Sequence, residues 1–263
     1  MPSLQDIAMS VVDSVTASLP APVPNQAALA RCKLISHRGE HDNCSIMENT
    51  MDAFEQARQA GVWGIECDIR FTRDLVPVIC HDHCGTRVFG MNTPVAELSL
   101  SELRSTAAQV PTLQEVIKEF GKHMHLMLEI KEEHWPEPQQ QRESLAAALA
   151  PLSPIDDFHF LALNPDLFAR VDFVSNKACM PVAELNVGKL SKIALERGYG
   201  GLGGHYLLLG KTFFERHRAQ GQRLGIGFPG SKNALFRQLN RGIEWVFSND
   251  AVAMQAIIDE HLH

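Results

Sequence analysis

The sequence lacks an apolar run that approaches the roughly 20 residues of a membrane-spanning helix. It also lacks a clustered excess of lysine and arginine, and its formal net charge is -7. Proteins that bind a nucleic-acid backbone need such a cluster, so we expect neither integral membrane association nor a nucleic-acid partner. The charge does not exclude a small anionic substrate, because a few basic groups can dominate the potential inside one pocket.

The N-terminus lacks the basic residues that open a signal peptide and carries Asp6 and Asp13 instead. We therefore expect the N-terminus to be retained and the protein to be cytoplasmic. The 6 cysteines lack the spacing of a disulfide framework, so we expect reduced thiols. The run CHDHC over 80–84 brings cysteine and histidine together, but no second cluster at finger-like spacing accompanies it, which disfavours a zinc site.

The composition is that of an ordinary globular protein, with 45% apolar and 21% charged residues. Apolar residues at helical spacing predict a helix over 3–18, which the stretch LPAPVPN ends. We expect residues 1–30 to form this N-terminal helix and a linker. Residues 31–263 are expected to form one domain, because α/β barrels commonly have about 250 residues.

After the linker, short apolar runs alternate with helical segments to the end of the chain. The alternation predicts an α/β fold, a (β/α)8 TIM barrel with an extra N-terminal helix, and an open doubly wound sheet is the alternative. Thr112 and Glu115 predict a capping box, and 83–110 is expected to be an irregular insertion. The predicted strands are 32–37, 64–71, 125–131, 158–163, 177–184, 200–207, 223–228 and 244–249.

Charged and histidine side chains gather at the ends of the early predicted strands, where a barrel builds its active site. Glu66 and Asp68 are two apart on one strand and so point to the same side, as do Glu129 and Lys131. Three acids in apolar strands call for a cation, because buried charges are costly unless they are paired or bound to a metal. Oxygen ligands without cysteine favour Mg²⁺ or Ca²⁺.

Cationic and proton-exchanging groups accompany these acids. Arg38 and Lys131 are donors suited to a phosphate, the first as a bidentate fork and the second as a point charge. His37 and His81 are a candidate acid/base pair, since imidazole exchanges protons near neutral pH. Together these groups favour the cleavage of a small-molecule phosphodiester.

The motifs that carry these residues occur in a specific order. HRG is followed by MENT, then by GIECDIRFTRDLVPVICHD, VPTLQEV and LEIK. Over residues 34–131 this series resembles the glycerophosphodiester phosphodiesterase family, whose members are TIM barrels. The resemblance implies metal-dependent hydrolysis of glycerophosphodiesters to an alcohol and glycerol 3-phosphate, a reaction of lipid and glycerol metabolism.

The resemblance also implies a role for each candidate residue. Glu48 would support the site from the first helix of the barrel. The catalytic pair would be His37 and His81. The metal ligands would be Glu66, Asp68 and Glu129, and the phosphate would be held by Arg38 and Lys131.

The sequence departs from the family pattern mainly in its late loops. Met47 replaces a usual proline, the seventh strand continues as GIGFPG without a tryptophan, and the eighth ends in SNDA. Asn249 and Asp250 in that last stretch are expected to cap the final helix. Because late loops shape the pocket around the leaving alcohol, two alternatives stay open. One is phospholipase D-like cleavage of lysophospholipids or sphingolipids, and the other is a non-catalytic phosphometabolite-binding barrel, against which the two histidines argue.

Overall fold

The computed structural model describes residues 17–262 of the chain. The helix expected over 3–18 lies outside these residues except for its last two positions, so it stays a prediction. The division into 1–30 and 31–263 likewise stays a prediction. All elements that carry the candidate residues lie within the described part.

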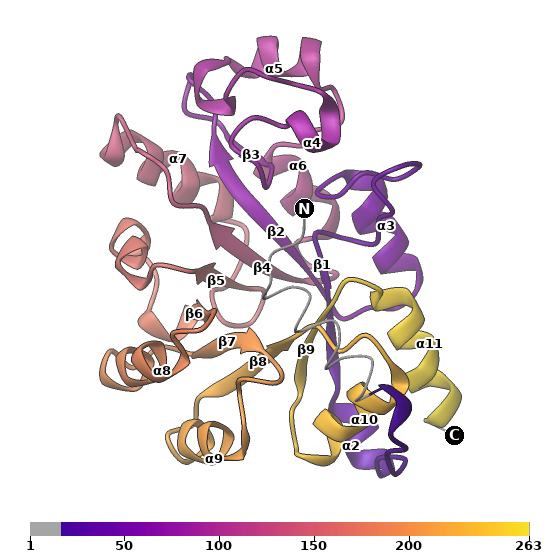
Figure 1. Cartoon of the computed structure of the whole chain (residues 1–263). Coiled ribbons are helices and arrows are strands. Elements are labelled where there is room, and N and C mark those ends of the chain that lie inside the picture. Colours follow the sequence, from indigo (N-terminus) through magenta and orange to yellow (C-terminus); the bar gives the residue numbers. More distant parts are fainter. Residues whose placement is uncertain (1–16, 263) are drawn as a thin grey trace.

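Eight parallel strands close into a barrel (Figure 1). Closure occurs at β1, which pairs in parallel with β2 on one side and with β9 on the other. The predicted TIM barrel is therefore confirmed, and the open doubly wound sheet is wrong, because an open sheet leaves its outer strands unpaired. The eight strands are β1 (Lys33–His37), β2 (Gly64–Phe71), β4 (His125–Ile130), β5 (Phe158–Ala162), β6 (Cys179–Ala183), β7 (Gly201–His205), β8 (Arg223–Gly227) and β9 (Trp245–Ser248).

Helices connect the strands and cover the outside of the barrel (Figure 1). The predicted capping box is present, with the Thr112 hydroxyl accepting from the Glu115 backbone and the Glu115 carboxylate accepting from Thr112. Short 3-10 helices η2 (Pro165–Val171) and η3 (Asn176–Ala178) join β5 to β6. Apart from two short helices of the excursion described next, the α-helices with bounds inside the described residues are α2 (Gln26–Arg31), α3 (Met51–Gln59), α6 (Leu113–Phe120), α7 (Pro138–Leu149), α8 (Val187–Glu196), α9 (Lys211–Ala219), α10 (Lys232–Asn240) and α11 (Ala251–His261).

The connection that follows β2 forms an excursion beyond the end of the barrel (Figure 1). It contains β3 (Pro77–Ile79), antiparallel to β2, then α4 (Thr86–Phe89), η1 (Val95–Glu97) and α5 (Leu100–Thr106). Residues 83–110, expected to be irregular, thus include two short α-helices. The excursion has a small hydrophobic core of its own, which includes Val78, Met91 and Leu103.

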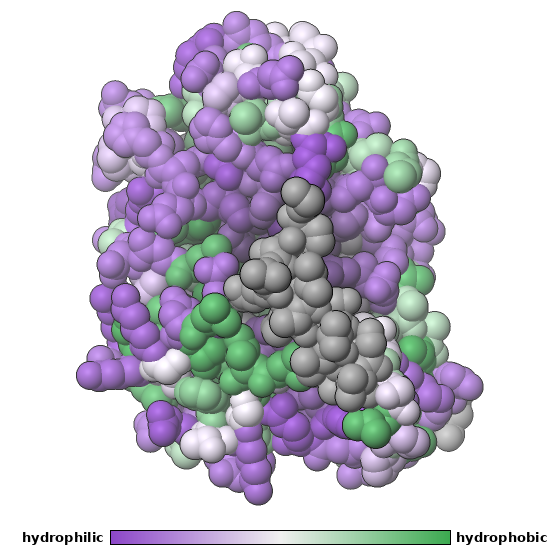
Figure 2. Space-filling view, in the orientation of Figure 1, coloured by the Kyte–Doolittle hydropathy of each residue, from purple (hydrophilic) through white to green (hydrophobic). Residues whose placement is uncertain are grey.

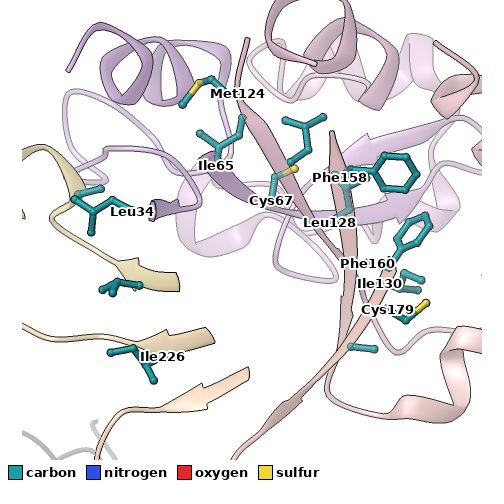
Figure 3. Close-up of a cluster of buried hydrophobic side chains, with 14 of the residues drawn as sticks. Leu34, Ile65, Cys67, Met124, Leu128, Ile130, Phe158, Phe160, Cys179 and Ile226 are labelled. Carbon is teal, nitrogen blue, oxygen red and sulfur yellow. The ribbon is translucent and has the colours of Figure 1, made fainter. Parts of the chain in front are cut away.

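Side chains alternate between the two sides of each barrel strand. The outward set packs against the helices, as Figure 3 shows for Ile65, Cys67 and Leu128. The inward set fills the barrel and is crowded. At Gly225, an added Cβ would lie 2.8 Å from Phe247 and equally close to Met180, so a larger residue there would displace these two side chains.

All six cysteines are free thiols, as expected. Among the helices of residues 17–262, none has the length and apolar character needed to cross a membrane. The cytoplasmic location stays a prediction.

Candidate active site

The seven candidate residues come together at the carboxyl ends of β1, β2 and β4 and just after β3. A cavity of about 900 Å³ opens there. Asp68 adjoins this cavity through Glu66 and Glu129, since carboxylate oxygens of the three acids lie within 4.8 Å of one another. The other six candidates line the cavity directly and are His37, Arg38, Glu66, His81, Glu129 and Lys131.

A strained turn after β1 directs Arg38 into the site. Arg38, Gly39 and Asn49 have φ values of 60°, 79° and 57°, in the left-handed region. A Cβ at Gly39 would lie 2.7 Å from the Cβ of Ala53, so glycine is required by both conformation and space. The amide of Arg38 donates to the Glu66 carboxylate at 3.2 Å, which joins the turn to β2. Strain of this kind is characteristic of functional sites.

The three acids form a buried cluster. Glu66 and Asp68 are 2% and 1% exposed. Lys131 Nζ lies 2.7 Å from Glu129 Oε1 and 3.2 Å from Asp68 Oδ1. Within the described residues, neither Glu66 Oε1 nor Asp68 Oδ1 has a hydrogen-bond partner. Asp68 Oδ1 is instead paired with the charge of Lys131. Buried carboxylate oxygens that lack donors and face one another fit a hard divalent cation.

The cluster is electrostatically unfavourable without such a cation. Burial, followed by Asp68 and Glu129, raises the pKa of Glu66 well above its usual value. Burial and then Asp68 also raise the pKa of Glu129. Burial acts in the same direction on Asp68, but Lys131 and Arg38 outweigh it and lower the pKa of that carboxyl. A divalent cation among the three oxygens would favour the ionised form of each acid.

His37 is oriented by a residue from the opposite end of the chain. Its Nδ1 lies 2.7 Å from Asn249 Oδ1, so Nδ1 donates and Nε2 is left to exchange a proton. Nε2 lies 3.8 Å from Glu66 Oε2. Burial, and after it the charge of Arg38, lowers the pKa of His37 to about 4. His37 is therefore neutral near pH 7, and its Nε2 can accept a proton.

The predicted capping role of Asn249 and Asp250 is wrong. Asp250 occupies the N-cap position of α11, but no side-chain hydrogen bond caps this helix. Asn249 instead binds His37. The available signal was topological: in a closed barrel the last strand lies beside the first, so a polar residue at its end lies near the end of β1.

His81 is held through both its ring and its backbone. The ring Nδ1 lies 2.7 Å from Asp82 Oδ1, which leaves Nε2 to exchange a proton. The His81 carbonyl accepts two hydrogen bonds from Arg70, at 3.0 Å and 2.8 Å. Arg70 also pairs with Glu133 at 2.6 Å and is nearly buried. Neither residue was predicted from the sequence: Arg70 lies within the motif GIECDIRF but had no assigned role, and Glu133 follows the motif LEIK.

Glu48 contacts Arg38 from the turn before α3, whereas the resemblance implied support from within the first helix. Its carboxylate accepts from Arg38 at 3.0 Å and from Asn43 at 2.9 Å. It also accepts a bidentate pair of hydrogen bonds from Arg87, which sequence analysis missed. The neighbouring Asn49 donates to Asp68 Oδ2 at 2.8 Å. The turn before α3 thus holds both the phosphate-binding candidate and a metal-ligand candidate.

The other side of the cavity is mainly apolar, although Glu184 and His205 also line the cavity. Leu161, Val182, Leu208 and Phe228 line it, together with several glycines. Leu163 also lines it and is 42% exposed. Figure 2 shows hydrophobic residues gathered near the ends of β6, β7 and β8, whereas hydrophilic residues cover the region of β2, β4 and α4. The cavity therefore has a charged side and an apolar side.

The sequence matches known proteins of one family. Residues 37–192, more than half of the chain, match the profile described as the glycerophosphoryl diester phosphodiesterase family. Glycerophosphodiester phosphodiesterase 1 of Mus musculus is 34% identical over 122 residues, which are 39% of this chain and 36% of that protein. A glycerophosphodiester phosphodiesterase of Caldanaerobacter subterraneus is 33% identical over 110 residues, 37% of this chain and 44% of that protein. The matches thus span well under two thirds of these relatives.

Solved structures show the same fold. A phosphodiesterase of Oleispira antarctica, in complex with the product sn-glycerol-3-phosphate, superimposes with a TM-score of 0.73 at 22% identity, over 88% of this chain and 99% of that chain. A glycerophosphodiester phosphodiesterase of Thermotoga maritima gives a TM-score of 0.70 at 22% identity, over 86% of this chain and 98% of that chain. At this level of identity the likeness concerns the barrel.

Proposed function

The chain belongs to the glycerophosphoryl diester phosphodiesterase family, and from that premise we propose that it hydrolyses glycerophosphodiesters to an alcohol and glycerol 3-phosphate. One observation carries the proposal. Three clustered carboxylates, two cations and two histidines surround a single cavity. Those groups suit cleavage of a phosphodiester bond, which requires charge stabilisation at the phosphate and proton transfer on both sides of it.

In the proposed mechanism the phosphate binds between Arg38 and Lys131. A divalent cation, Mg²⁺ or Ca²⁺, held by the carboxylate cluster would neutralise negative charge on the phosphate oxygens. His37 Nε2 takes a proton from the attacking water as its oxygen bonds to phosphorus. The bond from phosphorus to the alcohol oxygen breaks, and His81 gives that oxygen a proton. The alternative nucleophile is a neighbouring hydroxyl of the substrate, which would produce a cyclic phosphate before water completes the hydrolysis.

The apolar side of the cavity favours a second candidate substrate. Leu163, Leu208 and Phe228 offer hydrophobic contact on the side opposite the acids. Such a surface would accommodate the apolar part of a lysophospholipid or sphingolipid, and would give it little hydrogen bonding. The same catalytic groups would then perform phospholipase D-like cleavage.

A panel of three substrates tests these proposals. Glycerophosphocholine, a lysophospholipid and a chromogenic phosphodiester are incubated with the protein, with and without Mg²⁺, Ca²⁺ or Mn²⁺. We expect metal-dependent turnover of glycerophosphocholine with glycerol 3-phosphate as product, and none by a variant that lacks both histidines. Preferred turnover of the lysophospholipid would favour the second candidate. Binding of all three without turnover under any metal would contradict both and support a non-catalytic barrel.

A further inference from the structure

One arginine outside the seven candidate residues connects two parts of the site. Arg87 lies on α4 of the excursion. Its two terminal nitrogens donate to the two oxygens of Glu48, at 2.7 Å and 2.6 Å. Its Nε donates to Asp82 Oδ2 at 3.0 Å. Among the residues that the structure describes, no other side chain donates hydrogen bonds to both carboxylates.

The first contact affects Arg38. Glu48 is 3% exposed, and its carboxylate binds Arg38 as well as Arg87. Two guanidinium groups therefore share one carboxylate, and the three groups have a net charge of about +1. Without Arg87, Glu48 would neutralise Arg38 alone, and less positive charge would face the phosphate.

The second contact affects His81. Asp82 accepts from His81 through Oδ1 and from Arg87 through Oδ2. Because a carboxylate bound at both oxygens cannot rotate freely, Arg87 fixes the group that orients the imidazole. A partner of this kind sets the tautomer and direction of a functional histidine.

Packing does not account for Arg87. The α4 helix has no buried residue, and the Arg87 side chain is 47% exposed. An exposed arginine that makes three hydrogen bonds to two carboxylates gives up side-chain freedom without burying apolar surface. Hydrogen bonds of this kind are expected where the positions of the two carboxylates, those of Glu48 and Asp82, matter for the site.

We propose that Arg87 is a positioning residue for this reaction, holding Arg38 through Glu48 and His81 through Asp82. The inference rests on the proposed function and deepens it. It gives the excursion a function, because α4 supplies the side chain that positions Arg38, which follows β1, and His81, which follows β3. Arg87 itself touches no reacting atom.

The test compares Arg87→Met with Arg73→Met. Arg73 is the matched control, since it is 57% exposed, pairs with Glu102 at 2.6 Å in the same excursion, and contacts none of the candidate residues. Loss of a group that orients functional residues typically costs about 10- to 100-fold in activity. We expect such a loss in kcat/KM on glycerophosphocholine for Arg87→Met, and less than about a twofold change for Arg73→Met.

Two readouts distinguish positioning from a structural role. A p-nitrophenyl phosphodiester needs little protonation of its leaving group, so the loss in kcat for Arg87→Met should be smaller on it than on glycerophosphocholine. In combination with Asp82→Asn, the losses should be less than multiplicative, because both substitutions break one chain of contacts. Arg87→Lys keeps the charge without the fork and should lie between parent and Arg87→Met; it provides the same comparison if Arg87→Met does not fold.

The outcomes distinguish failure of the positioning role from failure of the proposed function. Parent-like kinetics of Arg87→Met, or equal losses on both substrates together with multiplicative effects, would overturn the positioning role while the parent still turns over. Absence of turnover by the parent would contradict the proposed function itself, and the inference with it.

Discussion

Asn249 binds His37 at 2.7 Å although 212 positions separate the two residues in the chain. The contact exists because β9 closes the barrel against β1, with Ser248 opposite Ser36 in the register. The carbonyl oxygen of Asn249 holds the proton of His37 on Nδ1 and leaves Nε2 for the substrate.

Asn249→Ala should lower kcat on glycerophosphocholine about 10- to 100-fold, because the His37 ring loses its orienting partner. Asp250→Ala is the control, since this neighbour occupies a helix terminus without a side-chain cap and should change kcat by less than about twofold. Steady-state kinetics on both variants check the prediction. Equal activities would show that His37 does not depend on Asn249.

His37→Ala and His81→Ala should each lower the rate about 10²- to 10⁴-fold with folding intact, as expected for the loss of a positioned acid or base. The leaving group separates the roles. On a p-nitrophenyl phosphodiester, His81→Ala should recover much of its activity, whereas His37→Ala should not. Recovery by His37→Ala instead would reverse the assignment, and losses of only a few-fold would contradict both roles.

Arg38→Lys should raise KM and lower kcat, by about 10-fold or more in kcat/KM, because one ammonium cannot replace a planar fork that also meets Glu48 and Asp68. Arg31→Lys serves as control, since Arg31 pairs with Glu244 at the other end of the barrel. Kinetics of Arg38→Lys that match those of Arg31→Lys would show that Arg38 does not grip the phosphate.

Metal binding should stabilise the protein through Glu66. A cation at 100 times its dissociation constant adds about 2.7 kcal/mol to the unfolding free energy. Thermal unfolding with and without Mg²⁺ or Ca²⁺ should show that gain for the parent and little of it for Glu66→Gln. Without metal, Glu66→Gln should be as stable as the parent or more so, because the substitution removes a buried acid whose pKa is already raised. A gain of equal size in both proteins would place the cation elsewhere.

Acid should destabilise the protein through a histidine pair at the opposite end of the barrel. His125 Nε2 lies 2.8 Å from His159 Nδ1, and both side chains are buried. Burial lowers the pKa of His125 to about 4, and burial with the nearby His125 lowers that of His159 to about 3. The unfolded chain therefore binds these protons below about pH 6.5 and the folded chain does not, so the contribution of the pair to stability is constant above pH 6.5 and is lost as pH drops toward 4.

At pH 5 the loss should be about 2 kcal/mol for each histidine relative to pH 7. Urea unfolding at the two pH values measures it. His159→Gln cannot take up a proton at that position, so the difference between the two pH values should shrink in this variant. An unchanged difference would show that the pair does not control acid stability.

The barrel and its charged half could be predicted from sequence because their signals are local. The strand GIECDIRF was predicted over 64–71 and is found there, since an apolar run interrupted by Glu66 and Asp68 fixes both the element and its inward face. Asn249 and Arg87 could not be predicted in the same way. Their contacts depend on which strand closes the barrel and on how the excursion folds back, and both are decided by tertiary packing.

The two sides of the cavity come from different stretches of the chain. The candidate catalytic groups lie between His37 and Lys131, whereas the apolar wall comes from β5 onward. Substitutions in the apolar wall away from Phe228, whose ring centroid lies 4.7 Å from that of His37, therefore leave the bond-cleaving groups untouched. A lineage with this barrel can exchange one leaving alcohol for another by drift at those positions, while the first half and Asn249 keep the chemistry.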